Sequence, residues 1–255
     1  MKNNRILALS GNDIFSGGGL SADLATYTLN GLHGFVAVTC LTAMTDKGFE
    51  VFATDKAVFG HQLSSLKDVP LSGIKLGLLP NVDIAEQALD FVKVHDDLPV
   101  VLDPVLVCKE SHDVEVSALR DELLKFFPHT AVITPNLAEA ELLTQMPIKN
   151  LDDMKAAAKC LYHLGAKNVV VKGGTRLSSK RAIDVFFDGE KMETLDYPLL
   201  ANNNIGAGCT FASSIASQIV LGKSVLEAVK VSKEFVYQAI QHSDQYGVNQ
   251  HYEKQ

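Results

Sequence analysis

The sequence predicts an α/β fold of three layers, in which helices cover both faces of a mostly parallel sheet. Short apolar, β-branched runs alternate along the chain with amphipathic segments of helical length, which is typical of βαβ units. The runs Val100–Leu102 and Val169–Val171 are apolar without alternation, as expected for central parallel strands. Near residue 182 the pattern changes to two strands around Asp188-Gly189, which predicts a small β-hairpin.

The expected elements follow in chain order. The strands are Arg5–Leu9, Phe35–Leu41, Phe49–Ala53, Ile74–Leu78, Pro99–Leu102, Ala131–Ile133, Val169–Val171, Ala182–Phe187 and Lys191–Leu195. The helices are Gly19–Asn30, Asp55–Asp68, Val82–Val94, Val116–Phe127, Leu137–Thr144, Asp152–Leu164, Gly206–Leu221 and Val225–His242. No Pro/Ser-rich linker or internal repeat interrupts them, so a single domain over residues 1–255 is expected.

Composition excludes several classes of protein. The 255 residues carry Lys+Arg 23 against Asp+Glu 30, a formal net charge of −7, which argues against a general nucleic-acid or membrane-surface binder. No uncharged apolar run reaches the roughly 18 residues that a membrane span needs. Near the start, the apolar run Ile6–Leu9 is too short for a signal-peptide core, so a cytoplasmic protein is expected.

The chain has four cysteines, Cys40, Cys108, Cys160 and Cys209. No pair has CxxC spacing, so the sequence indicates neither a structural zinc site nor a thioredoxin motif, and reduced thiols are expected. Cys209 follows Gly206-Ala207-Gly208 at the start of an expected helix, where backbone N–H groups and the helix dipole favour an anion. A thiolate is favoured there as well, so Cys209 is a candidate base or nucleophile. The alternative, that small residues merely let this helix pack closely, is equally compatible with the pattern.

Other strand ends carry polar or glycine-rich segments that could bind a ligand. Ser10 to Asp13 with Gly17–Gly19 fits a ligand loop, or a flexible turn. Asn136 and Glu139 suit a hydrated Mg²⁺ near phosphates, or an Asn N-cap with Glu at the third helical position. Lys172-Gly173-Gly174 suits a phosphate contact, or an ordinary strand-end turn. Asp103 to Lys109 leads into a polar stretch that fits a lid, or an ordinary loop.

Taken together, these segments resemble one family over almost the whole chain. The chain is similar to the ribokinase-like vitamin kinases, in the branch that holds hydroxymethylpyrimidine kinase and related pyridoxal kinases. The matching segments are Ser10 to Asp13 with Gly17–Gly19, Ala22-Asp23-Leu24, Leu41 to Met44, Asp103 to Lys109, Thr134 to Asn136 with Glu139, Lys172 to Gly174, and Gly206 to Phe211. The last is the most specific, because most of the superfamily has Asp where Cys209 stands.

The resemblance implies a ribokinase-like fold and a phosphotransferase that uses ATP and Mg²⁺. It implies a γ-phosphate over Gly206, Ala207 and Gly208, and proton transfer from the substrate hydroxymethyl to Cys209. The implied ATP-binding residues are Asn136, Lys172, Gly173, Asp184 and Thr210, with Mg²⁺ held by Glu139 through water. The implied substrate-binding residues are Gly11, Asp13, Met44, Leu78, Val105 and Cys108.

Two of these positions distinguish substrates within the resembling family. Hydroxymethylpyrimidine kinases carry Gln where this chain has Met44, and usually Ala where it has Cys108. The resemblance therefore favours a pyridoxal or pyridoxine kinase whose Cys108 can add to the substrate aldehyde. A hydroxymethylpyrimidine or phosphomethylpyrimidine kinase and a divergent, non-catalytic vitamer-binding paralogue are the alternatives. The family also implies a homodimer that acts on a small molecule, with no nucleic-acid or membrane partner.

Overall fold

The computed structural model describes residues 4–106 and 113–251. Its strands are β1 (Arg5–Ser10), β2 (His33–Val38), β3 (Cys40–Thr45), β4 (Gly48–Ala53), β5 (Gly73–Leu76), β6 (Val100–Leu102), β7 (Val132–Ile133), β8 (Val169–Lys172), β9 (Arg181–Phe187) and β10 (Met192–Pro198). Its helices are α1 (Gly19–Leu29), α2 (Lys56–Leu66), α3 (Val82–Val94), α4 (Asp113–Leu124), α5 (Leu137–Thr144), α6 (Leu151–His163), α7 (Ala207–Val220) and α8 (Val225–Gln241), with a 3₁₀ turn at Phe127–His129.

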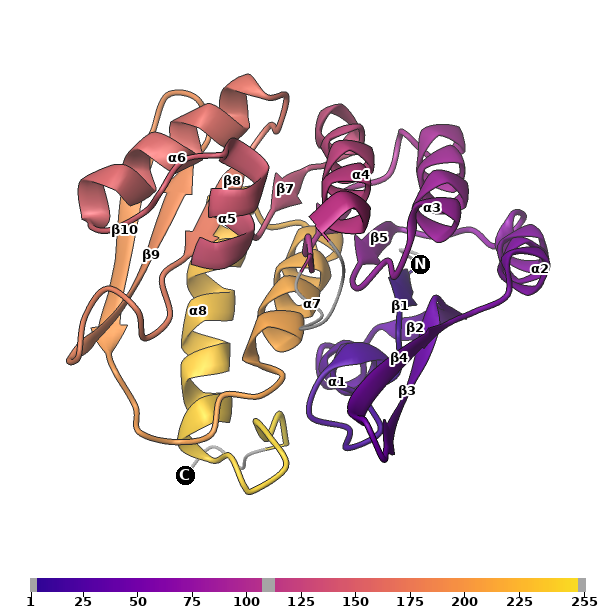
Figure 1. Ribbon diagram of the computed structural model, residues 1–255, viewed down its shortest axis with the longest axis horizontal. Helices are drawn as coiled ribbons and strands as arrows, with labels where there is room; N and C mark the ends of the chain where they lie inside the picture. The colour runs from indigo at the N-terminus through magenta and orange to yellow at the C-terminus, as the bar shows by residue number, and fades with distance from the viewer. Residues whose placement is uncertain (1–3, 107–112, 252–255) are drawn as a thin grey trace.

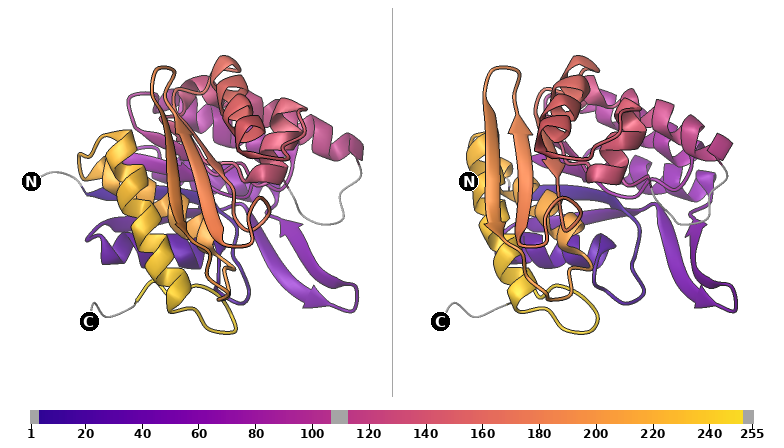
Figure 2. Two further views of the ribbon diagram at one scale, coloured as in Figure 1. Left: turned by 90° about the vertical axis from the view of Figure 1, so that its left-hand side faces the viewer. Right: turned by 60° about the vertical axis from the view of Figure 1, so that its left-hand side comes forward.

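An eight-stranded sheet forms the centre of the molecule, in the order β10-β9-β8-β7-β6-β5-β1-β2. The six strands from β8 to β2 pair in parallel, and β9 and β10 add antiparallel at one edge. Helices α2 to α6 lie on one face and α1, α7 and α8 on the other (Figures 1 and 2). The predicted α/β fold class is therefore confirmed.

Alternate strand residues pack against the two helical layers. In β1, Leu7 and Leu9 belong to the core on the α2–α6 side, whereas Ile6 and Ala8 belong to the core on the α1, α7 and α8 side. Side chains alternate across a strand, so each parallel strand needs apolar residues at every position. Among the described residues, no helix is long and apolar enough to cross a bilayer.

One expected strand was wrong in its extent. The sequence predicted a single strand over Phe35–Leu41, but the chain leaves the central sheet at Thr39 and continues as β3. The register explains the break, because Val38 pairs with Ser10, the last residue of β1. Beyond that point the chain finds a new partner in β4, and the two form a separate antiparallel ribbon that projects from the body (Figure 2).

The predicted hairpin is confirmed at β9 and β10. Gly189 has a φ of +98°, which suits a residue without a side chain. The Asp188 carboxylate accepts hydrogen bonds from the backbone N–H groups of Glu190 and Lys191, at 3.0 and 2.6 Å. The hairpin extends the central sheet, and it brings Asp184 of β9 beside Lys172 of β8.

Candidate active site

Two glycine-rich loops meet at the amino end of α7. Gly206 has a φ of +82°, and a Cβ atom on it would lie 1.5 Å from the carbonyl oxygen of Gly17. A Cβ atom on Gly18 would lie 3.5 Å from the sulfur of Cys209. Close packing against the first loop therefore explains the glycine at 206, and this packing brings that loop onto the thiol.

Asp13 holds the first of these loops in shape. Its carboxylate accepts hydrogen bonds from the backbone N–H of Gly18 at 2.8 Å and of Phe15 at 3.0 Å. The carbonyl oxygen of Gly11 accepts from Leu20 at the start of α1. Gly11 also lies against the core, since a Cβ atom there would be 2.2 Å from the sulfur of Cys40. Both predicted substrate residues thus have structural contacts within the loop itself.

Cys209 lies in the first turn of α7 and is half-buried. The backbone N–H of Gly19 lies near its sulfur and favours the thiolate. Burial raises the pKa of the Cys209 thiol above its ordinary value, and the Lys75 ammonium opposes that rise. The expectation that the helix start alone favours the thiolate was therefore wrong, because the covering glycine loop withdraws the sulfur from water.

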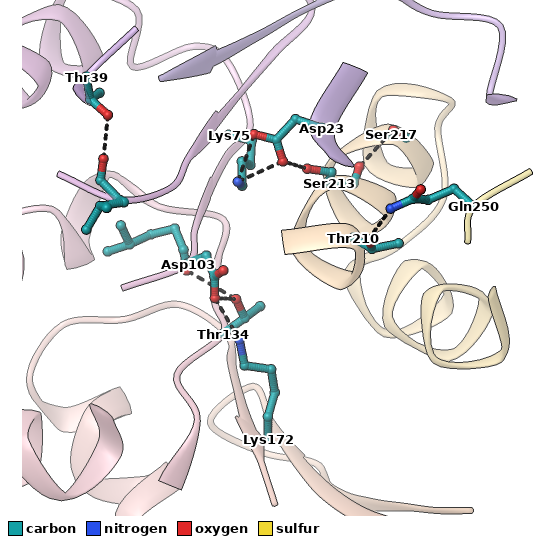
Figure 3. A network of polar contacts seen from close by, with 12 residues as sticks. Asp23, Thr39, Lys75, Asp103, Thr134, Lys172, Thr210, Ser213, Ser217 and Gln250 are labelled. Carbon is teal, nitrogen blue, oxygen red and sulfur yellow. Dashed lines mark hydrogen bonds and ion pairs between the residues drawn. The ribbon is translucent and has the colours of Figure 1, made fainter. Parts of the chain in front are cut away.

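Lys172 and Asp103 form the charged centre of the site. The Lys172 Nζ atom lies 2.7 Å from Asp103 Oδ1, which also accepts from the Thr134 hydroxyl at 3.0 Å (Figure 3). Although burial opposes it, the Lys172 and Lys75 ammonium groups lower the pKa of Asp103. A Cβ atom on Gly208 would lie 3.3 Å from Lys172 Nζ. A cation therefore stands directly against the amino end of α7, which suits an anionic ligand.

Asn136 and Glu139 form a reciprocal cap on α5. The Asn136 amide oxygen accepts from the Glu139 N–H at 3.0 Å, and a Glu139 oxygen accepts from the Asn136 N–H at 2.7 Å. The capping interpretation is thus confirmed. Burial raises the pKa of Glu139 to about 7, against the opposing effect of Lys172. Within the described residues, no group of three or more His, Cys, Asp or Glu side chains could hold a metal ion.

A cavity of about 430 Å³ opens beside these groups. The predicted residues that line it are Asn136, Lys172, Gly173, Asp184, Ala207 and Gly208. Leu200, Val236, Tyr237 and Ile240 also line it and supply apolar and aromatic surface. The cavity thus combines a cation and a helix start with an apolar wall, as a ligand with phosphates and a flat ring would require.

Two lysines of the site escaped the sequence analysis. Lys233 of α8 lines the cavity, pairs with Asp184 at 2.5 Å and lies 5.7 Å from the ring centre of Tyr197. Asp184 in turn accepts from the Gly173 N–H at 3.0 Å. Lys75 of β5 is fully buried beneath the glycine loops. A lysine inside the apolar run Ile74–Leu78 was a usable signal, whereas nothing in the sequence distinguished Lys233 from its neighbours.

Thr210 was predicted to contact ATP but does not line the cavity. Its side chain is fully buried, and its hydroxyl accepts a hydrogen bond from Gln250 at 2.9 Å. The same C-terminal segment is tied to the glycine loop, because the Val248 N–H donates to the Ile205 carbonyl at 3.0 Å. We therefore leave Thr210 out of the nucleotide site and assign it to anchoring the C-terminal segment.

The predicted substrate residues lie apart from this cavity. Met44 is 56% exposed on the β3–β4 ribbon. Leu78 is half-buried, and its carbonyl oxygen accepts from the Thr39 hydroxyl at 2.6 Å, which ties the start of the ribbon to the end of β5. Val105 is half-buried after β6. Cys108 lies outside the described residues.

The strand order brings these segments to one edge of the sheet. Gly11, Leu78, Val105, Asn136 and Gly173 follow β1, β5, β6, β7 and β8, whose carboxyl ends all point the same way. Ligands of open parallel sheets bind at this edge. Fold and site therefore define an α/β enzyme of the phosphate-transferring class, with one thiol between its two glycine loops.

Comparison with known proteins agrees with that class. The family model described as phosphomethylpyrimidine kinase matches residues 13–254. The chain is 37% identical over 253 residues to the pyridoxine kinase of Bacillus subtilis, covering 95% of this chain and 92% of that protein. It is 34% identical over 248 residues to the hydroxymethylpyrimidine/phosphomethylpyrimidine kinase of Aquifex aeolicus, covering 94% and 96%. The chain belongs to the phosphomethylpyrimidine kinase family and is a kinase.

Solved structures show the same architecture. An ADP complex of Bacillus subtilis pyridoxal kinase superposes with a TM-score of 0.89 at 36% identity, covering 96% of this chain and 95% of that one. Staphylococcus aureus pyridoxal kinase in complex with AMP-PCP and pyridoxal superposes with a TM-score of 0.87 at 30% identity, covering 97% and 93%. The ribokinase-like resemblance inferred from the motifs is thereby confirmed.

Proposed function

We propose that this protein is an ATP-dependent kinase that phosphorylates the 5′-hydroxymethyl group of pyridoxal or pyridoxine. The observation that carries the proposal is the position of Cys209, at the seam of the two glycine loops and on the same helix start as Gly208, which faces Lys172. A proton acceptor and a phosphate-binding centre thus lie side by side. The pyridoxine and pyridoxal kinases among its relatives support the choice of substrate.

The cavity fits a nucleoside triphosphate. The apolar surface near Tyr237 and Ile240 suits the base, and the Lys172 end suits the phosphates. Within the first turn of α7, the Ala207 N–H already donates to Asn204 at 3.1 Å. The first N–H groups of an α-helix have no acceptor within the helix. We therefore assign the N–H groups of Gly208 and Cys209 to the transferred phosphoryl group.

Cys209 acts as the base in this proposal. The hydroxymethyl oxygen attacks the γ-phosphorus, its proton passes to the Cys209 thiolate, and ADP leaves with the former bridging oxygen. Because burial raises the pKa of the thiol, the base is strong once ionised.

Mg²⁺ is assigned to Glu139, through water. The triphosphate would have to supply ligands to the Mg²⁺ ion, because the described residues hold no cluster of three potential ligands. Glu139 lies close enough to Lys172 and Asp103 for their charges to affect its pKa. A divalent cation at the phosphates would favour the ionised carboxylate. When bound, the ion would neutralise phosphate charge, while Glu139 and Asn136 orient the water around it.

We further propose one domain over the whole chain, and a homodimer. The β3–β4 ribbon exposes Leu41 and Phe52, which pair with each other on one face. An exposed apolar pair of this kind suits contact with a second copy. Sedimentation velocity should then give a mass of two chains, and a single-chain mass at micromolar concentration would contradict the dimer.

Hydroxymethylpyrimidine is the second candidate substrate, favoured by the family match and by the relative from Aquifex aeolicus. Purified protein should be assayed for ADP release with pyridoxal, pyridoxine and hydroxymethylpyrimidine at equal concentrations. We expect a higher kcat/KM for a B6 vitamer. A higher value for the pyrimidine would transfer the assignment to the second candidate, and turnover of neither would reject both.

A further inference from the structure

A buried ion pair lies beneath the candidate base and has no part in the chemistry described above. Lys75 of β5 and Asp23 of α1 are both 0% exposed, and Lys75 Nζ lies 2.8 and 3.0 Å from the two Asp23 carboxylate oxygens. The Ser213 hydroxyl donates to the same carboxylate (Figure 3). Taking two charges out of water carries a large desolvation cost, which their mutual attraction seldom exceeds by much. A gain in folding stability is thus a weak explanation for a buried ion pair at this position.

The pair is linked to Cys209 by two helices that run side by side. On α7, Ser213 lies one turn after Cys209, and on α1, Asp23 lies one turn after Gly19. Residues four apart share a helix face. The Gly19 N–H lies near the Cys209 sulfur, and one turn further along the Ser213 hydroxyl donates to Asp23. Because Ser213 lies one helical turn after Cys209, its bond to Asp23 places the Asp23–Lys75 pair about one turn from the thiol.

Several charged groups act on the Cys209 sulfur. The cations are Lys75 from β5 and Lys172 from β8. The anions or potential anions are Asp23 and Tyr27 from α1 and Asp103 after β6. The Asp13 carboxylate lies on the same side of Gly18 as the sulfur. Of the two cations, Lys75 has the larger effect against the rise in the pKa of the thiol that burial causes. Burial lowers the pKa of Lys75, but Asp23, Cys209 and Asp103 more than reverse this, so Lys75 stays charged.

We propose that Lys75 is a positioning residue for the phosphoryl-transfer reaction: held by Asp23, it supplies the positive charge that lets the covered Cys209 thiol ionise. This inference rests on the proposed role of Cys209 as the base. Lys75 acts through Cys209 and does not touch the substrate. Its effect must therefore be visible in the ionisation of Cys209, even without ATP or vitamer.

The test measures the alkylation of Cys209 by iodoacetamide as a function of pH, in the full chain, by mass spectrometry of the Cys209 peptide. The double variant Asp23→Leu/Lys75→Met removes both charges together and leaves neither partner unpaired. The loss of Lys75 should outweigh the loss of the opposing Asp23 charge, so we expect the Cys209 alkylation rate at pH 8 to fall about three- to tenfold. Lys75→Arg keeps the charge and should stay within about twofold of the wild type.

Two references separate charge from structure. Ser217→Ala removes a buried hydroxyl that bonds the Ser213 carbonyl on the same helix and changes no charge, so its alkylation profile should match the wild type. Cys160, on α6, should react at one rate in all variants. A folded double variant with an unchanged Cys209 profile overturns the proposal, and failure of that variant to fold would assign the pair to stability and overturn it too. Because no substrate is used, either result stands whether or not the proposed vitamer is correct.

Discussion

Gly208 lies directly against Lys172, so closely that a Cβ atom at position 208 would be 3.3 Å from the Lys172 Nζ atom. One residue belongs to the start of α7 and the other to the end of β8, and the strand order alone does not bring them together. Their contact joins a helix dipole to a fixed ammonium at one end of the cavity. A phosphoryl group placed there would be held from two sides.

Gly208→Ala should lower the rate of phosphoryl transfer without affecting folding. The added methyl group fits the helical backbone of α7 but shifts the Lys172 ammonium by a few tenths of an ångström. We therefore expect kcat to fall roughly tenfold, less than the roughly 100-fold loss for a misplacement of about 1 Å. The unfolding temperature should stay near that of the wild type. Gly206→Ala is the contrasting variant: its methyl group would lie 1.5 Å from the Gly17 carbonyl oxygen, at a φ of +82°. It should lower the free energy of unfolding by about 1–3 kcal/mol.

Lys172→Met should impair phosphoryl transfer more than substrate binding. Loss of one preorganised cation at the developing charge is expected to lower kcat roughly 10²- to 10³-fold. The substitution also removes the cation that neutralises the Asp103 carboxylate. That carboxylate would then repel the phosphates of ATP, so the KM for ATP should rise. Steady-state kinetics with varied ATP measures both effects. A variant with unchanged kcat would exclude Lys172 from the phosphate site.

Cys209→Ala should remove the proposed general base of the reaction. General base catalysis contributes roughly 10²- to 10⁴-fold, so kcat should fall by that factor while the fold is retained. Cys160→Ala is the matched control, since Cys160 lies on α6 across the sheet from α7. An unchanged rate in the Cys209 variant would mean that the measured activity comes from another source.

Met44→Gln should move substrate preference toward the pyrimidine. An amide at that position can donate to and accept from an aminopyrimidine edge, which the thioether of methionine does poorly. Val94→Gln is the control, because Val94 is an exposed apolar residue at the end of α3, in neither the site nor the proposed dimer contact. The ratio of kcat/KM for the two substrates should change in the first variant and stay constant in the second. Equal ratios in both would remove Met44 from the substrate site.

Glu139 should make stability depend on pH in the absence of nucleotide. Burial raises its pKa to about 7, above the value of 4.5 expected in the unfolded chain. Between these values the folded protein holds a proton that the unfolded chain has lost, so stability falls as pH rises. Glu139→Gln keeps the cap on α5 and should remove this loss, which amounts to about 3 kcal/mol between pH 5 and pH 8.

Glu141→Gln provides the control for this pH dependence. Arg176 lowers the pKa of the Glu141 carboxyl, so the group is ionised in both states above pH 5. Its substitution should change stability by the same amount at pH 5 and at pH 8. Urea unfolding at the two values measures both variants. A constant difference for Glu139→Gln as well would show that this carboxyl titrates normally.

The local patterns of the sequence predicted the fold and several of the residues that line the cavity. Parallel strands end at one edge, so residues that follow different strands, such as Asn136 and Lys172, had to meet there. The glycines before Cys209 indicated a helix start open to an anion, and the cavity lies beside it. These residues could be found from the sequence because each follows a strand or begins a helix. A parallel sheet brings all such positions to the same edge.

The remainder depends on contacts between distant segments. The break at Thr39 follows from the length of β1, and the pairing of Lys233 with Asp184 follows from how α8 crosses β9. The pKa of Cys209 depends on the loop that covers it, which a helix start alone does not reveal. No pattern within one segment carries such information.

The most direct test of the central claim is a crystal structure with AMP-PCP and pyridoxal bound together. The account predicts the 5′-hydroxymethyl oxygen within hydrogen-bond distance of the Cys209 sulfur, with the terminal phosphonate between it and Lys172. A hydroxymethyl group directed away from Cys209, or a triphosphate outside the cavity beside Gly208, would contradict it.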